Sequence, residues 1–292
     1  MSHGGSMSHQ GTTAIEKLIN STSMTHTAVR SGSWSDPKTW KGGRVPGKSA
    51  NVLIAKGVTV TYDTVGEVDL KTVAVRGRLQ FATWKATQMR VETIINAPEG
   101  RIDIGSQSRS VAADKQARII FTSDRPVNTG WDPEQLTKGL LSHGTVNIYG
   151  ADKQDKVRLA KNALAGDDTL SFKDNLTGWR VGDKIVLAGT SYSNDMSDRT
   201  NERFRDEVLT IREIHGNTIR FTNDNASNEA EKTKLRFDHK KHSQLDPNKI
   251  DLYAANLSRN VSFETENGKD VPISHRAHVM LMHNPNVKVL NA

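Results

Sequence analysis

The sequence contains no cysteine and no long apolar run. Without cysteine, neither a disulfide scaffold nor a thiolate metal site can form, and both a reducing cytosol and a bacterial exterior stay compatible. No stretch approaches the roughly 18 apolar residues that a membrane-spanning helix needs. The first ten residues also lack the charged and apolar regions of a classical secretory signal.

Hydrophobic and aromatic residues are scarce, at 35% and 5% of the 292 residues, and the mean hydropathy is −0.59. These values are low for a compact two-layer fold but suit a narrow solenoid, in which each coil buries only a thin apolar strip. The formal charge is +7, yet no run of five or six basic residues occurs. We therefore expect no nucleic-acid partner, and polyanionic glycans account for the basic balance at least as well.

Between residues 52 and 104 a sequence pattern recurs. In each copy, apolar and polar residues alternate on both sides of a glycine. The glycines Gly57, Gly77 and Gly100 are 20 and 23 residues apart. Alternation predicts strands with one buried face, and glycine permits a turn at positive φ. A period near two dozen residues predicts stacked coils of a parallel β-helix, each climbing about 4.8 Å. Gly144 follows 44 residues after Gly100, which predicts two coils of 22.

The pattern divides the chain into three parts. Residues 1–28 are rich in Ser, Thr, Gly and His and are predicted to be a flexible tail, with at most a short helix near residue 16. Residues 29–165 are predicted to be the β-helix domain. Residues 166–292 begin with short strands and turn residues, which predict an antiparallel β excursion before the β-helix continues.

Both ends of the predicted solenoid would expose edges. Trp34 and Trp40 lie just before the first coil, and we expect them to form an aromatic cap over its open end. The chain stops at Ala292 on a strand, and an uncovered strand invites pairing. We therefore expect that the natural polypeptide continues and carries further domains.

Several phrases occur in the order found in a known family. They are Gly32-Ser33-Trp34 with Trp40, residues 43–48, the strands around Gly57, Gly77-Arg78-Leu79, His143-Gly144, and residues 176–192, 256–261 and 278–283. Together they resemble the G8 (eight-glycine) domain family. Its members include the cell-migration-inducing hyaluronan-binding protein, its transmembrane relative, fibrocystin and bacterial extracellular proteins.

The resemblance implies an all-β, right-handed parallel β-helix, an extracellular or cell-surface setting, and association with hyaluronan or another polysaccharide. The animal relatives carry an insertion just after the His-Gly position, with residues linked to hyaluronan degradation. In this chain only residues 145–155 separate His143-Gly144 from the family phrase that begins at Lys156. The resemblance therefore does not imply hyaluronan-degrading activity for this chain.

Four histidines form a candidate metal site: His143, His275, His278 and His283. Neutral imidazoles suit zinc, and nearby carboxylates suit calcium, so the sequence is compatible with either ion. On one strand His275 and His283 would share a face and His278 would point the other way. A metal site would thus need a ligand such as His143 from another coil, and the alternative is histidines stacked at coil corners.

Four other residues form a candidate glycan site: Trp84, Trp131, Arg101 and Arg118. Indole rings stack on sugars, and guanidinium groups pair with the carboxylates of acidic sugars. The alternatives are structural tryptophans and a solvated basic face. No catalytic motif is present, and Asp167-Asp168 after a glycine reads equally well as an ordinary turn.

These features favour an extracellular β-helix module that binds polysaccharide. A hydrolase or lyase acting on acidic glycans is the first alternative, although catalytic residues are unknown. The second is a spike or adhesin in which the β-helix is only a stiff rod. Glycan binding distinguishes the module from the rod, and shortening of a glycan chain would identify the enzyme.

Overall fold

The computed structural model describes residues 6–122, 126–192, 204–241, 251–282 and 286–292. It is all-β with few helices, and it divides into two compact units. Unit 1 comprises residues 1–151 and 259–292, and unit 2 comprises residues 152–258, inserted between them in the sequence. The division therefore falls at residues 151 and 258, not at residue 165 as the strand pattern led us to expect.

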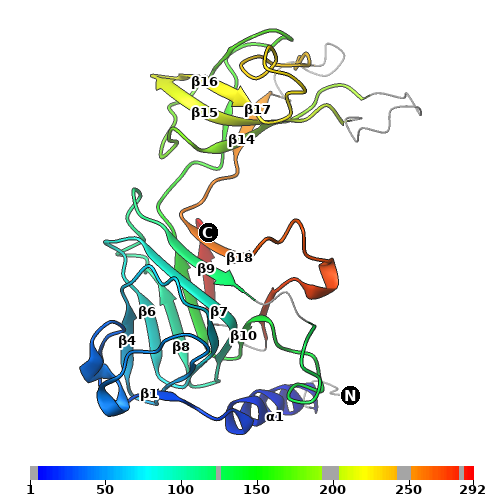
Figure 1. Ribbon diagram of the computed structural model, residues 1–292. Helices are drawn as coiled ribbons and strands as arrows, with labels where there is room; N and C mark the ends of the chain where they lie inside the picture. The colour runs from blue at the N-terminus through cyan, green and yellow to red at the C-terminus, as the bar shows by residue number, and fades with distance from the viewer. Residues whose placement is uncertain (1–5, 123–125, 193–203, 242–250, 283–285) are drawn as a thin grey trace. The chain divides into compact units, whose positions relative to one another are not determined.

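Unit 1 contains two sheets, called A and B here, in which all strands pair in parallel (Figure 1). Sheet A contains β1 (His26–Ala28), β3 (Asn51–Ile54), β5 (Leu70–Val75), β7 (Thr87–Asn96), β9 (Ala117–Phe121), β10 (Gly139–Ser142), β18 (Val261–Thr265) and β19 (His278–Leu281). Sheet B contains β2 (Gly32–Ser33), β4 (Thr59–Tyr62), β6 (Arg78–Phe81), β8 (Arg101–Ile104), β11 (Thr145–Tyr149) and β20 (Val287–Leu290). From β1 to β8, successive strands alternate between the two sheets.

The core of unit 1 follows from the alternating sequence pattern. In sheet B, Val60, Leu79, Ile102 and Val146 stand opposite one another on β4, β6, β8 and β11, and all four are buried. Burying each such side chain contributes about 1.5–3 kcal/mol. The residues between them on each strand face outward, which leaves the outer face of sheet B polar.

The glycines of the repeat are needed for two different reasons. Gly57 has a φ of +79°, as a turn glycine should. The φ angles of Gly77, Gly100 and Gly144 are not positive, so the positive-φ explanation is wrong for them. A Cβ atom at any of these three positions would lie well inside 3.0 Å of backbone carbonyl oxygens in a neighbouring connection. Close backbone packing, and not turn geometry, therefore excludes a side chain.

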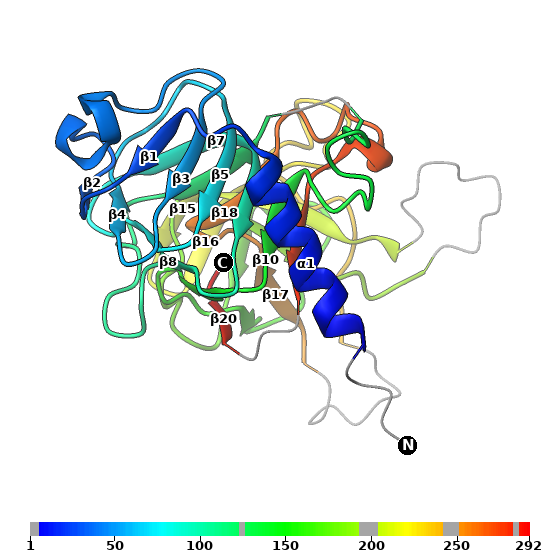
Figure 2. The same cartoon turned by 90° about the horizontal axis from the view of Figure 1, so that it is seen from below.

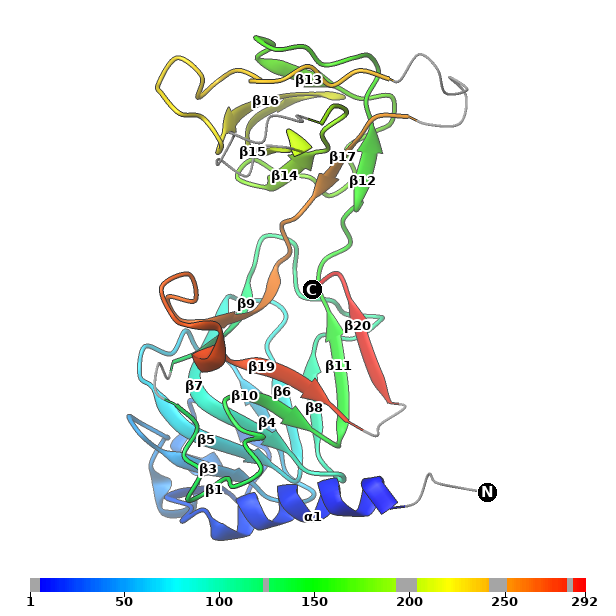
Figure 3. The same cartoon turned by 90° about the vertical axis from the view of Figure 1, so that its right-hand side faces the viewer.

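The long interval between Gly100 and Gly144 does not form two coils. β8 and β11 are direct neighbours in sheet B, with Arg101 opposite Thr145. The intervening residues instead add β9 to sheet A. The first half of the long strand β7 pairs with β9, and its second half pairs with β10 (Figure 3).

Aromatic rings pack together next to the first strands of both sheets. Trp34 and Trp40 are buried and meet edge to face with ring centroids 4.8 Å apart, and Tyr62 lies 5.0 Å from Trp34. Trp40 Nε1 donates a hydrogen bond to the Trp34 carbonyl oxygen at 2.8 Å. Two short 3-10 helices, η1 (Pro37–Thr39) and η2 (Lys41–Gly43), flank Trp40.

Part of the expected flexible tail is a packed helix, α1 (Ser6–Ser21). Ile15, Leu18 and Ile19 are buried and belong to one apolar cluster with Ala74 and Ile95 of sheet A. Figure 2 shows α1 lying along this sheet. The tail prediction failed because the helix is stabilised by the outer face of sheet A, which short-range sequence signals do not reveal.

Unit 2 is one antiparallel sheet with the strand order β12-β17-β14-β15-β16-β13. Its strands are β12 (Lys156–Arg158), β13 (Thr169–Ser171), β14 (Lys184–Leu187), β15 (Glu207–His215), β16 (Thr218–Asn223) and β17 (Tyr253–Asn256). The antiparallel pairing agrees with the predicted excursion, although it starts earlier in the sequence. Among the described residues, no helix combines the length and the apolar character needed to cross a bilayer.

The close backbone packing at the glycines predicts a large effect of one methyl group. Gly100→Ala should lower the free energy of unfolding by about 1–3 kcal/mol, because its Cβ would press on the Val75 carbonyl oxygen. Gly47→Ala is the matched control, since no atom lies within 4 Å of its added Cβ, and it should change stability by less than about 1 kcal/mol. Urea unfolding measures both, and equal midpoints would contradict the packing argument.

Candidate functional site

The outer face of sheet B carries two rows of polar side chains that run across the strands. Strand register places Thr59, Arg78, Arg101 and Thr145 in one row, and Thr61, Gln80, Asp103 and Asn147 in the next. Gln80 donates to the Thr61 hydroxyl at 2.8 Å. Outward positions thus form a continuous hydrogen-bonding surface, and we call it the polar face of sheet B.

Asp103 is at the centre of this face and is almost fully buried. Its carboxylate accepts hydrogen bonds from Arg78 Nε at 2.5 Å, from Arg101 Nε at 2.7 Å and from Asn147 Nδ2 at 2.8 Å. Burial alone would raise the pKa of Asp103, but the hydrogen bonds from Arg101, Asn147 and Arg78 outweigh it and lower the pKa. Asp103 is therefore a fixed anion that orients its donors.

A groove of about 230 Å³ lies beside Asp103, and we call it the Trp84 groove. It is lined by Thr61, Arg78, Gln80, Phe81, Thr83, Trp84, Asp103, Gly105, Ser106, Ser108 and Arg109. Trp84 is 61% exposed, an unusual state for so large an apolar ring. Arg109 is also exposed and forms no ion pair within the described ranges, so the groove combines a bare indole with an uncommitted cation.

Trp131, the second candidate tryptophan, lines a separate cavity of about 480 Å³, which we call the Trp131 cavity. Its walls come from β3, β5 and β7 of sheet A, from the residues that end and follow α1, and from the loop after β9. The two tryptophans therefore lie in different loops, line separate depressions and do not share one platform.

The two candidate arginines are already paired. Arg101 is bound to Asp103, and Arg118 forms a two-pronged ion pair with Glu264, at 3.1 and 2.8 Å. The carboxylate of Glu264 is the first cause of the raised pKa of the Arg118 guanidinium. Neither of these predicted arginines is therefore free for a ligand, whereas Arg109 lines the Trp84 groove and has no ion-pair partner among the described residues.

Three of the candidate histidines lie within the described residues, and these three are not placed to share a metal ion. His275 is in the 3-10 helix η4 (Ile273–His275), and its carbonyl accepts from Lys138 Nζ at 3.2 Å. His278 Nε2 lies 3.1 Å from the Leu136 carbonyl oxygen, and His143 is buried. His283 lies outside the described residues. Within the described ranges, no three His, Asp or Glu side chains are placed to hold a metal ion.

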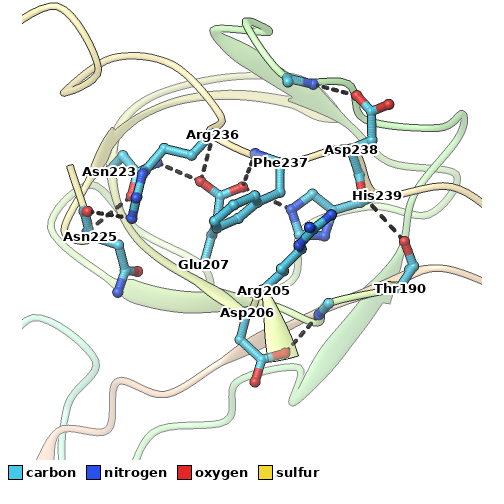
Figure 4. Close-up of polar contacts among 12 residues, drawn as sticks. Thr190, Arg205, Asp206, Glu207, Asn223, Asn225, Arg236, Phe237, Asp238 and His239 are labelled. Atoms are coloured by element: carbon cyan, nitrogen blue, oxygen red, sulfur yellow. Dashed lines mark hydrogen bonds and ion pairs between the residues drawn. The ribbon is translucent and has the colours of Figure 1, made fainter. Parts of the chain in front are cut away.

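Unit 2 contains a buried ion pair that sequence reasoning missed. Glu207 and His239 are both fully buried, with His239 Nε2 2.8 Å from Glu207 Oε2 (Figure 4). The same carboxylate accepts from Asn223 Nδ2 at 2.6 Å and from the Arg236 backbone N–H at 2.8 Å. His239 Nδ1 faces the Ala188 carbonyl oxygen at 2.9 Å, so both ring nitrogens face acceptors. No sequence signal links positions 32 residues apart on different elements.

The Glu207 and His239 side chains are both fully buried, and their network joins separate segments of unit 2. Desolvation acts to raise the pKa of Glu207, but hydrogen bonds from His239, the Arg236 backbone and Asn223 lower it overall. Phe237 follows Arg236 and is contacted by the guanidinium groups of Arg205 and Arg236, at 5.5 and 5.1 Å from the ring centre. The Glu207–His239 pair and its hydrogen bonds therefore hold residues 235–239 against β15 and β16.

Unit 1 has two parallel sheets, and its sequence is interrupted by unit 2, an antiparallel sheet. This fold places the protein in the class of all-β modules. Within this class, residues 39–160 match the model of the G8 domain. Residues 39–160 therefore contain a G8 domain, which confirms the resemblance seen in the glycine and tryptophan phrases.

Similar proteins include fibrocystin of Mus musculus, which is 26% identical over 265 residues, 84% of this chain and 6% of fibrocystin. Fibrocystin of Canis lupus familiaris is 24% identical over 68% of this chain and 5% of its own length. A G8 domain-containing protein of Dictyostelium discoideum is 27% identical over 65% of this chain and 13% of its own length. The chain thus spans a small part of the length of each of these relatives.

The Glu207–His239 pair predicts an acid-sensitive unit 2. A lowered folded-state pKa means that Glu207 contributes stability above its unfolded pKa of about 4.3, and that this contribution is lost as the pH falls through the folded value. Glu207→Gln should therefore destabilise the hairpin β15–β16 by about 3 kcal/mol at pH 7, with the difference from the parent shrinking below pH 4.

Hydrogen exchange of the β15–β16 peptides at several pH values measures this difference. Glu213→Gln, on the same strand but half-exposed, is the matched control and should change protection little. A Glu207→Gln defect that stays constant from pH 7 to pH 3 would refute the assignment.

Proposed function

We propose that this chain is an extracellular module that binds an acidic polysaccharide along the polar face of sheet B. The observation that carries the proposal is the Trp84 groove, in which an exposed indole, an uncommitted Arg109 and fixed hydrogen-bonding side chains line one depression. Sugar rings offer C–H faces to an indole, and their carboxylates pair with guanidinium groups.

We also infer that unit 1 is wound as a right-handed parallel β-helix. Its support is the alternation of successive strands between two parallel sheets, together with the right-handed preference of parallel crossovers. In such a fold the outward rows rise by about 4.8 Å per coil, and a pyranose ring with its linkage is of similar length. A glycan chain lying across the strands would then meet a new polar side chain with each sugar.

The chemistry of the groove suits binding better than cleavage. Asp103 is the carboxylate among its lining residues, and its donors keep it ionised, so it cannot supply a proton as a general acid. Glycosidases need two carboxylates of different protonation state. A hydrolase or lyase acting on acidic glycans is therefore our second hypothesis for the function.

The extracellular setting rests on the G8 domain, since proteins with this domain include surface and extracellular ones. The relatives are many times longer than the matched segment, so we further propose that the module works as one part of a larger polypeptide. In that context it could hold the larger protein to a glycan matrix.

The proposal predicts binding of the purified protein to hyaluronan or alginate, but not to neutral dextran, by affinity electrophoresis or calorimetry. Trp84→Ala and Arg109→Ala should each weaken binding about tenfold, equivalent to roughly 1.4 kcal/mol. Higher salt should weaken it further, because a charge pair is involved.

Leu257→Ala is the matched control, an exposed apolar residue of unit 2 that should leave binding unchanged. No binding to any acidic glycan would favour the rod reading. Shortening of the glycan chains would instead identify the enzyme.

A further inference from the structure

We propose that the Trp131 cavity is a separate binding site for one neutral pyranose ring. The proposal does not depend on the Trp84 groove. It is based on the cavity itself, on the fixed Trp131 indole in its wall, and on two opposite charges that form no ion pair among the described residues.

The cavity has a size and a lining suited to a small polar ligand. Its volume of about 480 Å³ is within the range of roughly 300–1,000 Å³ that is usual for small-molecule sites. Hydroxyl and amide side chains dominate its walls, with the Trp131 indole as the large apolar surface. A sugar ring, with hydroxyls at its edge and C–H groups on its face, matches such a lining.

Trp131 is held in place by its own loop. The Asn128 carbonyl oxygen accepts from the backbone N–H groups of Trp131 at 3.1 Å and Asp132 at 2.8 Å. Asp132 is buried, and its carboxylate accepts from the Thr137 backbone N–H at 2.7 Å and hydroxyl at 2.8 Å. Trp131 also packs against the apolar cluster beneath α1. The indole is therefore positioned before any ligand arrives.

Asn51 has a buried acceptor that lacks a donor. Its Nδ2 donates to the Ser23 carbonyl oxygen at 3.1 Å, and because that oxygen can only accept, the amide orientation is fixed. Asn51 Oδ1 is then buried with no hydrogen-bond partner, and Asn51 lines the cavity. This oxygen has almost no solvent-accessible surface, so Asn51 forms part of the polar wall of the cavity and makes no direct ligand contact.

Lys71 and Glu92 decide the charge of the ligand. They lie at the same level on neighbouring strands, between the pairs Leu70–Val91 and Thr72–Thr93, and both line the cavity. Neither forms an ion pair with any residue that the structure describes. Their charges cancel, so the pair gives no net attraction to a charged ligand, and each side chain can hydrogen-bond a hydroxyl. A neutral ring is therefore preferred.

The test uses the full chain and methyl glycosides of glucose, galactose, mannose and N-acetylglucosamine, with methyl glucuronide as the charged comparison. Ligand-detected NMR and calorimetry should show saturable binding of at least one neutral glycoside. Trp131→Ala and Glu92→Gln should each weaken it tenfold or more, while Trp84→Ala should not. Glu92→Gln alters a partly exposed side chain, so it tests the site even where Trp131→Ala fails to fold.

No saturable binding of any neutral glycoside would overturn the proposal, as would tighter binding of the glucuronide or retention of affinity in Glu92→Gln. Tighter binding of a neutral oligosaccharide than of its methyl glycoside would support a glycan end as the source of the ring, and equal binding would support a free sugar. Because the Trp84 variants affect only acidic polymers, failure here is distinguishable from failure of the proposed function.

Discussion

The structure of unit 1 depends on how closely successive backbone connections approach one another. At Gly77, Gly100 and Gly144, the space that a Cβ would need is taken by carbonyl oxygens of a neighbouring connection. That closeness permits the hydrogen bonds between connections, such as the Thr145 N–H to the Gly100 carbonyl at 3.0 Å. It keeps the strands of both sheets in register, so inward positions build apolar columns and outward positions build polar rows.

The outer faces of sheets A and B differ in polarity, and the two candidate sites result from this difference. Sheet A presents apolar residues such as Ala74 and Ile95 outward, and α1 covers them. Sheet B presents polar residues outward, and their hydrogen bonds to the buried Asp103 replace the water that this carboxylate lost. One cavity therefore forms where α1 ends, and one groove forms on the uncovered polar face.

Unit 2 also contains a buried carboxylate, that of Glu207, which needs hydrogen-bond donors in place of water. A buried carboxylate is tolerated only where donors surround it, and Glu207 has a ring nitrogen of His239, an amide and backbone N–H groups. The resulting network fastens one segment to a hairpin. The network stabilises unit 2 only while every buried polar group in it has a hydrogen-bond partner. Removing one member leaves the others unpaired, so the effect on stability is large.

The sequence by itself determined the strands, their inward and outward alternation and the G8 domain, because these depend on local patterns. The tertiary structure alone decided that Arg118 is bound to Glu264, 146 residues away, and that Arg109 has no ion-pair partner in the described part of the chain. It also decided that residues 6–21 form a packed helix and that Glu207 meets His239. Pairings of this kind depend on which distant strands become neighbours, and no short-range pattern encodes that choice.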